Sequence, residues 1–123
     1  MSGVEMEVIN YVEFPANNMV KTKGFFETAF GWRFSDFGED YMAFDQQGIE
    51  GGFYRSEKTS RTENGAALIV FLSNNIEASL KKIKAAGGEV VVDIFSFPGG
   101  RRFHFVEPSG NEFAVWTKTT GDE

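Results

Sequence analysis

The order of apolar and polar residues predicts a strand, a helix and three further strands in the first half of the chain. Residues 8–14 are apolar or favour strands, and Pro15 is expected to end that run. Asn17 and Asn18 can cap a helix that Gly31, which suits a left-handed backbone, would end. Side chains at helical spacing mark the helix: Thr22, Phe25, Phe26, Ala29 and Phe30. The three further strand-like runs cover residues 32–37, 41–45 and 49–54.

The second half predicts the same order of elements. Residues 66–72 form a near-continuous apolar run, which is typical of a strand buried on both faces. Asn74, with Glu77 three residues later, resembles a capping box at the start of a helix. The apolar stripe of that helix consists of Ile76, Leu80 and Ile83, and Gly87 and Gly88 would end it. Strands are expected over residues 90–95, 103–106 and 112–116, with residues 117–123 frayed.

These two halves are copies of one structural unit. Three pairs of matching residues lie 62 positions apart: Asp45 and Glu107, Gly48 and Gly110, Tyr54 and Trp116. In the second copy, Pro108 and Gly110 occupy the second and fourth positions of a four-residue turn, which predicts a hairpin. We therefore expect one α+β domain over residues 1–123. Its two βαβββ units would cover residues 4–56 and 65–118, joined by an exposed polar linker over residues 55–65.

Composition narrows the class of protein. The net charge is −6 and the basic residues do not cluster beyond residues 81–84, so nucleic acid is not an expected partner. The chain has no cysteine, which excludes disulfides, iron–sulfur clusters and thiol catalysis. It has no apolar run of about 18 residues, and residues 1–5 lack the basic and apolar regions of a secretion signal. We therefore expect a cytoplasmic protein with no membrane partner. The 14 phenylalanines predict an aromatic core, with some of them lining a cavity.

Three segments carry a resemblance to a known family. Residues 25–32 (FFETAFGW) are similar to the pattern F-Y-x-x-x-F-G-W, and residues 48–53 (GIEGGF) and 107–111 (EPSGN) are two further matches. With them the chain resembles the vicinal oxygen chelate superfamily, the group of glyoxalase I, bleomycin-resistance proteins and extradiol dioxygenases. The resemblance covers nearly the whole chain. It implies a glyoxalase-like mixed sheet curled around a concave cleft, helices on the outside, and a homodimer.

Metal enzymes of this family place one ligand on the first strand and one on the last strand of each unit. The resemblance puts these four positions at Tyr11, Gly52, Leu68 and Ala114. A divalent metal prefers imidazole or carboxylate ligands, and the only histidine of the chain is His104. The resemblance therefore implies this fold without the usual metal site, and we expect neither a metal nor another cofactor.

The same four positions identify which side chains would line the cleft, because side chains alternate along a strand. We predict a ligand-binding set of Tyr11, Glu13, Glu50, Tyr54, Leu68, Phe97, Arg101, Glu112 and Trp116. The opposite face would pack under the helices and includes Val8, Val12, Phe53, Ile69, Phe71, Phe113 and Val115. An apolar lining ringed by aromatic and acidic side chains suits a planar organic ligand.

Several of these residues have more than one interpretation. Tyr54 and Trp116 can stack on a ring or enclose a cation, or simply fill the mouth of the cleft. The glutamates of the set can pair with a cationic ligand, form an oxygen-rich metal site away from the usual one, or remain solvated. Arg101, next to Arg102, can hold a carboxylate or phosphate, or form a surface salt bridge. Residues 97–100 can form a loop over the cleft or a plain connection between strands.

Two classes of function follow. The first is a metal-free protein that binds a small aromatic or cationic organic molecule, similar to the bleomycin-resistance branch of the family. The second is an enzyme that acts on a small organic substrate through acid–base groups or an unusual metal, with Tyr11, Glu13 and His104 as candidate catalytic residues. His104 can equally be a structural residue of its strand. A dimeric scaffold without a ligand is a third interpretation.

Overall fold

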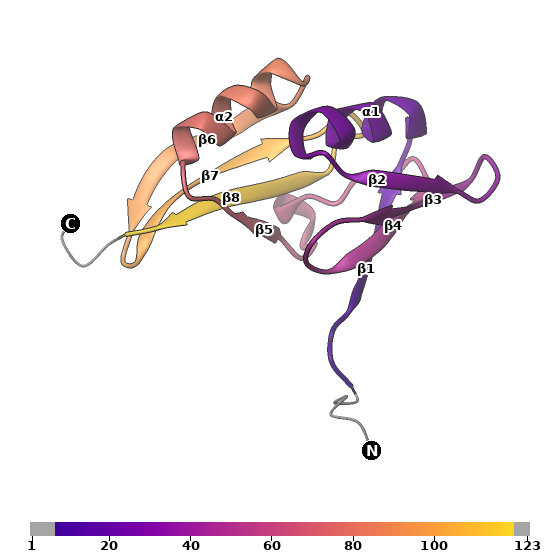
Figure 1. Cartoon of the computed structure of the whole chain (residues 1–123), viewed down its shortest axis with the longest axis horizontal. Coiled ribbons are helices and arrows are strands. Elements are labelled where there is room, and N and C mark those ends of the chain that lie inside the picture. The colour runs from indigo at the N-terminus through magenta and orange to yellow at the C-terminus, as the bar shows by residue number, and fades with distance from the viewer. Residues whose placement is uncertain (1–6, 120–123) are drawn as a thin grey trace.

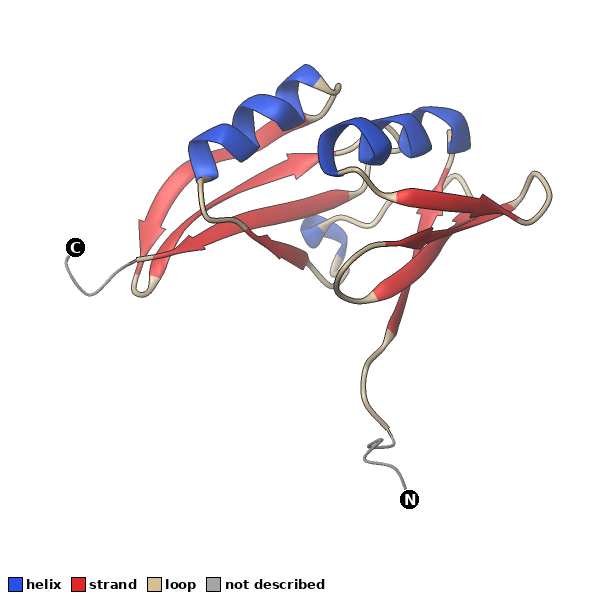
Figure 2. Ribbon diagram, in the orientation of Figure 1, coloured by secondary structure: helices blue, strands red, loops and turns tan. Residues whose placement is uncertain are grey.

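A computed structural model describes residues 7–119 as two four-stranded sheets with two helices on the same side of them (Figure 1, Figure 2). Sheet 1 has the strand order β1-β4-β3-β2 and contains β1 (Tyr11–Ala16), β2 (Arg33–Asp36), β3 (Tyr41–Asp45) and β4 (Glu50–Arg55). Sheet 2 has the order β5-β8-β7-β6 and contains β5 (Ile69–Leu72), β6 (Glu89–Phe97), β7 (Gly100–Val106) and β8 (Glu112–Lys118). The helices are α1 (Met19–Phe30) and α2 (Ile76–Ala85), with a short 3₁₀ helix, η1 (Thr62–Asn64), in the linker. The predicted α+β class is confirmed.

The ends of α1 follow the predicted chemistry, whereas the start of α2 differs by one residue. Asn18 caps α1 by accepting a hydrogen bond from the backbone N–H of Lys21 at 3.0 Å, and Gly31 ends the helix with a φ of 70°. In α2 the cap is Asn75, which accepts from the N–H of Ala78 at 3.1 Å. The predicted capping box at Asn74 is therefore wrong.

Two strand predictions are wrong because β1 and β5 lie at the edges of their sheets. β1 continues through Pro15 to Ala16, since an edge strand tolerates a proline that donates no hydrogen bond. Val8 lies before this strand and is 60% exposed, so it does not pack under the helices. β5 is not buried on both faces, because Leu72 is 61% exposed.

Aromatic side chains fill the space between the helices and the sheets. Phe26 of α1 stacks on Trp32 at 4.4 Å between ring centroids and meets the edge of Phe113 at 5.4 Å. Phe14 of β1 lies 4.9 Å from Phe113 of β8, so the core is continuous across the two units. Phe53, Phe113 and Val115 are buried in this core, as predicted for the face that packs under the helices.

The predicted turn at residues 107–110 forms, and residues 97–100 form the plain connection between strands that was the alternative to a loop. Gly110 has a φ of 95° and its N–H donates to the carbonyl of Glu107 at 2.7 Å, which closes the four-residue turn between β7 and β8. Phe97 pairs directly with Gly100 across a two-residue turn. The interpretation of residues 97–100 as a loop over the cleft is therefore wrong.

Hydrogen bonds to Glu107 join the second unit to the first. Glu107 is buried, and its Oε1 accepts from the Thr22 hydroxyl at 2.6 Å and the Ser109 N–H at 2.9 Å. Its Oε2 accepts from the Asn111 amide at 2.6 Å, which also donates to the Pro15 carbonyl at 2.6 Å. We call these five residues the inter-unit clamp.

The predictions for the two ends of the chain can be compared with the structure only over residues 7–119. Thr117 and Lys118 belong to β8, so the predicted fraying does not begin at residue 117, and residues 120–123 lie outside the described residues. Residues 4–6 of the predicted first unit also lie outside them. Within residues 7–119, neither helix has the length and apolar character needed to cross a membrane.

Candidate functional site

Each sheet has one face that the helices cover and one face that they leave uncovered (Figure 1). We call the uncovered faces open face 1 and open face 2, after their sheets. The pairing register places Tyr11, Glu13, Tyr41, Glu50, Gly52 and Tyr54 on open face 1. Open face 2 carries Val70, Leu72, Phe95, Phe97, Arg102, His104, Glu112, Ala114 and Trp116.

A chain of two phenols and a carboxylate lies on open face 1. The Tyr41 hydroxyl donates to Glu13 Oε2 at 2.9 Å, and the Tyr11 and Tyr41 hydroxyl oxygens are 2.5 Å apart. Because Tyr41 has one hydroxyl proton and gives it to Glu13, Tyr11 must be the donor to Tyr41. The oxygen of Tyr11 then keeps a lone pair that can accept a hydrogen bond from a ligand.

Tyr41 owes its position to the glycine beside it. A Cβ on Gly52 would come within 2.2 Å of the Tyr41 hydroxyl oxygen, so only glycine leaves room for this ring over the sheet. Burial, followed by the hydrogen bonds to Tyr11 and Glu13, raises the pKa of Tyr41 above its usual value. Tyr41 therefore stays protonated at neutral pH and acts as a hydrogen-bond donor.

The four positions at which the resemblance places metal ligands do not carry the usual ligands here. Gly52 and Ala114 carry no donor atom, Leu68 is apolar, and the Tyr11 hydroxyl is bonded to Tyr41. Within residues 7–119, no group of three or more His, Cys, Asp or Glu side chains is arranged to hold a metal ion. These residues do not fit the metal of the family's enzymes, and we derive no step through it.

On open face 2, His104 and Glu112 form a buried pair. His104 Nδ1 lies 2.7 Å from Glu112 Oε2, and both side chains are almost fully buried. The linker covers them: the N–H and hydroxyl of Thr62 each donate to Glu112 Oε1 at 2.9 Å, and Arg61 Nε lies 3.7 Å from the same oxygen. This pair agrees with the interpretation of His104 as a structural residue and does not leave Glu112 open to a ligand.

Aromatic rings surround an arginine farther along open face 2. Phe95, Arg102 and Trp116 lie opposite one another on β6, β7 and β8. The guanidinium carbon of Arg102 is 5.4 Å from the centre of the Phe95 ring and 6.0 Å from that of Phe97. The Phe97 and Trp116 rings are 6.1 Å apart. We call these four residues the aromatic–arginine cluster.

The predicted ligand set included Phe97 and Trp116 of this cluster but missed Phe95 and Arg102. β6 contains irregularities between Val90 and Val92 and between Val92 and Phe95, which shift the alternation of side chains. Such bulges leave no clear mark in the sequence. Arg102 was accessible to prediction, because the four-residue turn at residues 107–110 fixes the pairing of β7 with β8 and sets Arg102 opposite Trp116.

The structure separates several other residues of the predicted site. Arg101 lies on the helix side of β7, where its Nη1 donates to Glu77 of α2 at 2.7 Å. Tyr11 and Glu13 are on sheet 1, whereas His104 is on sheet 2, so the three candidate catalytic residues do not form one group. The remaining members of the set are placed as follows: Glu50 is exposed at the start of β4, Tyr54 is exposed on open face 1, and Leu68 is half-buried just before β5.

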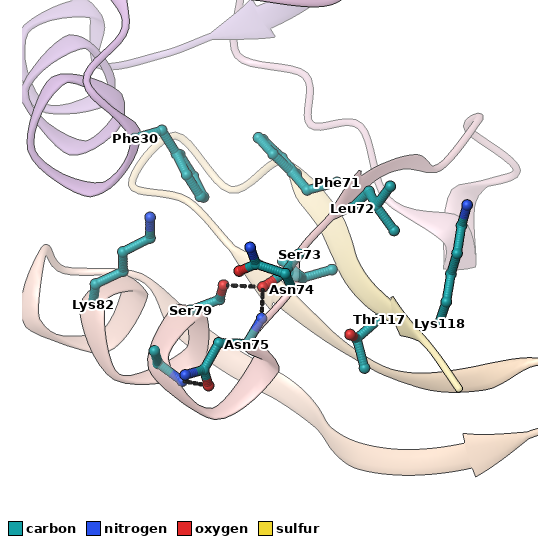
Figure 3. Close-up of a pocket in the computed structure, with 12 residues that line it drawn as sticks. Phe30, Phe71, Leu72, Ser73, Asn74, Asn75, Ser79, Lys82, Thr117 and Lys118 are labelled. Carbon is teal, nitrogen blue, oxygen red and sulfur yellow. Dashed lines mark hydrogen bonds between the residues drawn. The ribbon is translucent and has the colours of Figure 1, made fainter. Parts of the chain in front are cut away.

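A groove of about 750 Å³ lies at the start of α2 and borders open face 2, with which it shares Leu72 (Figure 3). It is lined by Phe30, Phe71, Leu72, Ser73, Asn74, Asn75, Ala78, Ser79, Lys82, Val115, Thr117 and Lys118. Two of its polar side chains bond each other, since the Ser73 and Ser79 hydroxyls are 2.7 Å apart. The Lys82 ammonium lies 5.3 Å from the centre of the Phe30 ring. The groove offers a second surface for a small ligand.

Comparison with known proteins decides the family. The model of the Glyoxalase/Bleomycin resistance protein/Dioxygenase superfamily matches residues 8–115. The chain belongs to this superfamily. The predicted resemblance is confirmed, and the two βαβββ units are the superfamily's fold.

Solved structures of superfamily proteins superimpose well at low sequence identity, which shows the shared fold. A glyoxalase-related enzyme from Fulvimarina pelagi has a TM-score of 0.76 at 12% identity, over 92% of this chain and 89% of that one. Lactoylglutathione lyase from Agrobacterium tumefaciens has a TM-score of 0.70 at 14% identity, over 92% of this chain and 95% of that one.

Among curated proteins, the anthracycline biosynthesis protein DauV of Streptomyces sp. (strain C5) is 32% identical over 89 residues. DnrV of Streptomyces peucetius, with the same description, is 30% identical over 89 residues. Each match covers 69% of this chain and 32% of the relative. The matched region therefore spans about a third of the length of these relatives.

The His104–Glu112 pair predicts a pH-dependent contribution to stability. Burial raises the pKa of Glu112, but hydrogen bonds from His104 and Thr62 outweigh it and lower the pKa to about 2. The carboxylate therefore stabilises the fold above its ordinary pKa of 4.5, and this contribution is lost as the pH falls toward 2. Glu112→Gln should lower the unfolding free energy by about 1–3 kcal/mol at pH 7. Urea titrations should show the difference from wild type shrinking between pH 4.5 and 2.

Glu50→Gln is the matched control, because it removes the same charge from an exposed strand end. It should change the unfolding free energy by less than about 0.5 kcal/mol. A constant difference between Glu112→Gln and wild type over this pH range would contradict the assigned role of the carboxylate.

Proposed function

We propose that this superfamily member binds a planar aromatic small molecule on its open faces. The observation that carries the proposal is the aromatic–arginine cluster, in which Phe95, Phe97 and Trp116 share a sheet face that the chain itself leaves partly exposed. Aromatic side chains bind ring systems by stacking and edge contacts, and they supply much of the affinity of small-molecule sites.

The curated relatives support this class of ligand. DauV and DnrV are described as anthracycline biosynthesis proteins, and anthracyclines contain a planar system of fused rings. The match spans about a third of those proteins. The proposal of a fused-ring ligand therefore rests on the aromatic surface of this chain, and the relatives are a supporting observation.

Open face 1 would serve the polar part of such a ligand. Glu13 and Glu50 are exposed there and suit a cationic substituent, and the Tyr11 oxygen can accept a hydrogen bond. Open face 2 would thus bind the aromatic part of a ligand, and open face 1 would bind a cationic part. We propose binding without catalysis, because Tyr11 and Glu13 lie on a different sheet from His104. No metal or other cofactor is part of this proposal.

We also propose that two chains pair through their open faces and enclose the ligand between them. Large apolar side chains on these faces remain in contact with water in one chain: Tyr11 44%, Tyr54 39%, Val70 40%, Leu72 61% and Phe95 39% exposed. Covering them would release water from apolar surface, which favours association. Pairing would also allow Tyr54 and Trp116, which lie on different sheets of one chain, to contact one ligand.

The first prediction from this proposal concerns the ligand contacts. Trp116→Ala and Tyr54→Ala should each weaken the binding of anthraquinone, a planar fused-ring probe, by about 1–3 kcal/mol, because each change removes a ring contact. Isothermal titration calorimetry measures the affinity. Unchanged affinity in both variants would place the ligand elsewhere on the protein.

Phe113→Ala is the control for the assignment of faces. Phe113 lies on the same strand as Trp116 but is buried in the core. Its truncation should lower the unfolding free energy by about 3–5 kcal/mol in a denaturant titration. Trp116→Ala and Tyr54→Ala should unfold close to wild type, and a large loss of stability in Trp116→Ala would count against its assignment to the open face.

The second prediction concerns pairing. Light scattering should give a mass of twice the 13.7 kDa of one chain. Leu72→Glu should convert the pair to single chains, because it buries a charge at the interface. A single-chain mass for wild type at about 50 µM, a concentration at which a dissociation constant near 1 µM leaves most chains paired, would end the pairing proposal.

A further inference from the structure

We propose that Arg102 binds a carboxylate carried by the aromatic ligand. This inference rests on the proposed function and names the chemical class of the ligand more closely. It assigns the anion-binding role to Arg102 on open face 2, whereas its neighbour Arg101 faces the helices.

Its first support is the position of the guanidinium. Arg102 lies across from Phe95 on one side and Trp116 on the other, and its guanidinium carbon is within 6.0 Å of both phenylalanine rings of the cluster. Rings at these distances hold the flat group by cation–π contact and limit its side-chain freedom. A ligand ring that contacts Trp116 or Phe97 would therefore bring a substituent next to a fixed positive charge.

The second support is that Arg102 has unused binding capacity. Its Nε is buried and has no hydrogen-bond partner within the described residues. No carboxylate of residues 7–119 lies within 4.0 Å of its guanidinium, although the whole chain carries a net charge of −6. By contrast, Arg55 and Arg101 pair with Asp40 and Glu77 at 2.9 Å and 2.7 Å. The positive charge of Arg102 therefore has no carboxylate partner in the described part of the chain, and its terminal Nη groups are the donors that a ligand would meet.

The chemistry of the guanidinium selects the partner. Arginine presents parallel N–H donors that match the two oxygens of a carboxylate, and such charge-assisted hydrogen bonds are about twice as strong as neutral ones. A carboxylate carries one negative charge, which one guanidinium balances. A ligand ring placed on the cluster would displace water from the guanidinium, and this would strengthen the pair relative to one in bulk solvent. The expected ligand is therefore an aromatic carboxylate.

The test compares two probes of the same shape on three proteins. Anthraquinone-2-carboxylate and its neutral carboxamide are titrated calorimetrically into wild type, Arg102→Gln and Arg101→Gln. Wild type should bind the carboxylate about ten times more tightly than the amide. Arg102→Gln should bind both with affinities within about twofold of each other. Arg101→Gln, which removes the same charge one residue away on the opposite face, should keep the wild-type preference.

Three other results would overturn the role of Arg102 alone, and a fourth would also overturn the proposed function. Equal binding of the two probes by wild type overturns the role of Arg102 and leaves the proposed function intact. So does a carboxylate preference that survives in Arg102→Gln or disappears equally in Arg101→Gln. Binding of neither probe by wild type overturns the proposed function and this inference together.

A measurement on wild type covers the case in which Arg102→Gln fails to fold. The Nε–H signal of Arg102 in a ¹⁵N–¹H spectrum reports on a change at its guanidinium when an oxyanion binds to the Nη groups. It should shift on addition of the carboxylate and stay within line width on addition of the amide. An unshifted Arg102 signal at saturating carboxylate would overturn the inference.

Discussion

The fold depends on one buried carboxylate that joins the two units. Glu107 accepts hydrogen bonds from Thr22 of the first unit and from Ser109 and Asn111 of its own turn. Burial raises the pKa of this carboxyl, and the hydrogen bonds offset part of that effect. Asn111 extends the contact to the Pro15 carbonyl of β1. The clamp thus joins the start of α1 and the edge strand of sheet 1 to the β7–β8 turn.

The internal repeat does not reproduce this clamp at α2, and the groove of Figure 3 lies there instead. Asn75 and Ser79 stand 57 positions after Asn18 and Thr22 and occupy the same places in their helix. Ser79, however, bonds the Ser73 hydroxyl of its own unit. The counterpart of Glu107 is Asp45, which is exposed. Duplication therefore gives two similar units with one clamped junction and one open groove.

Local chemistry made much of the fold predictable from the sequence. Gly31 and Gly110 mark backbone positions with positive φ, and the apolar alternation of β8 assigns Phe113 to the core and Trp116 to the opposite face. The wrong predictions concern features that depend on contacts between residues far apart in the sequence. Pro15 can lie within β1, and Leu72 can be exposed, because their strands lie at the edges of the sheets. The bulges of β6 place Phe95 on the same face as Arg102. Similarly, Glu112 gave no sign in the sequence that the linker would cover it.

Mapping the bound ligand on the wild-type protein tests the central claim most directly, because it distinguishes the open faces from the groove. Backbone amide signals are followed in a ¹⁵N–¹H spectrum during titration with anthraquinone. Binding at the aromatic–arginine cluster predicts the largest shifts at Phe97, Arg102 and Trp116. Shifts centred instead on Ser79 and Lys82 of the groove would contradict the account.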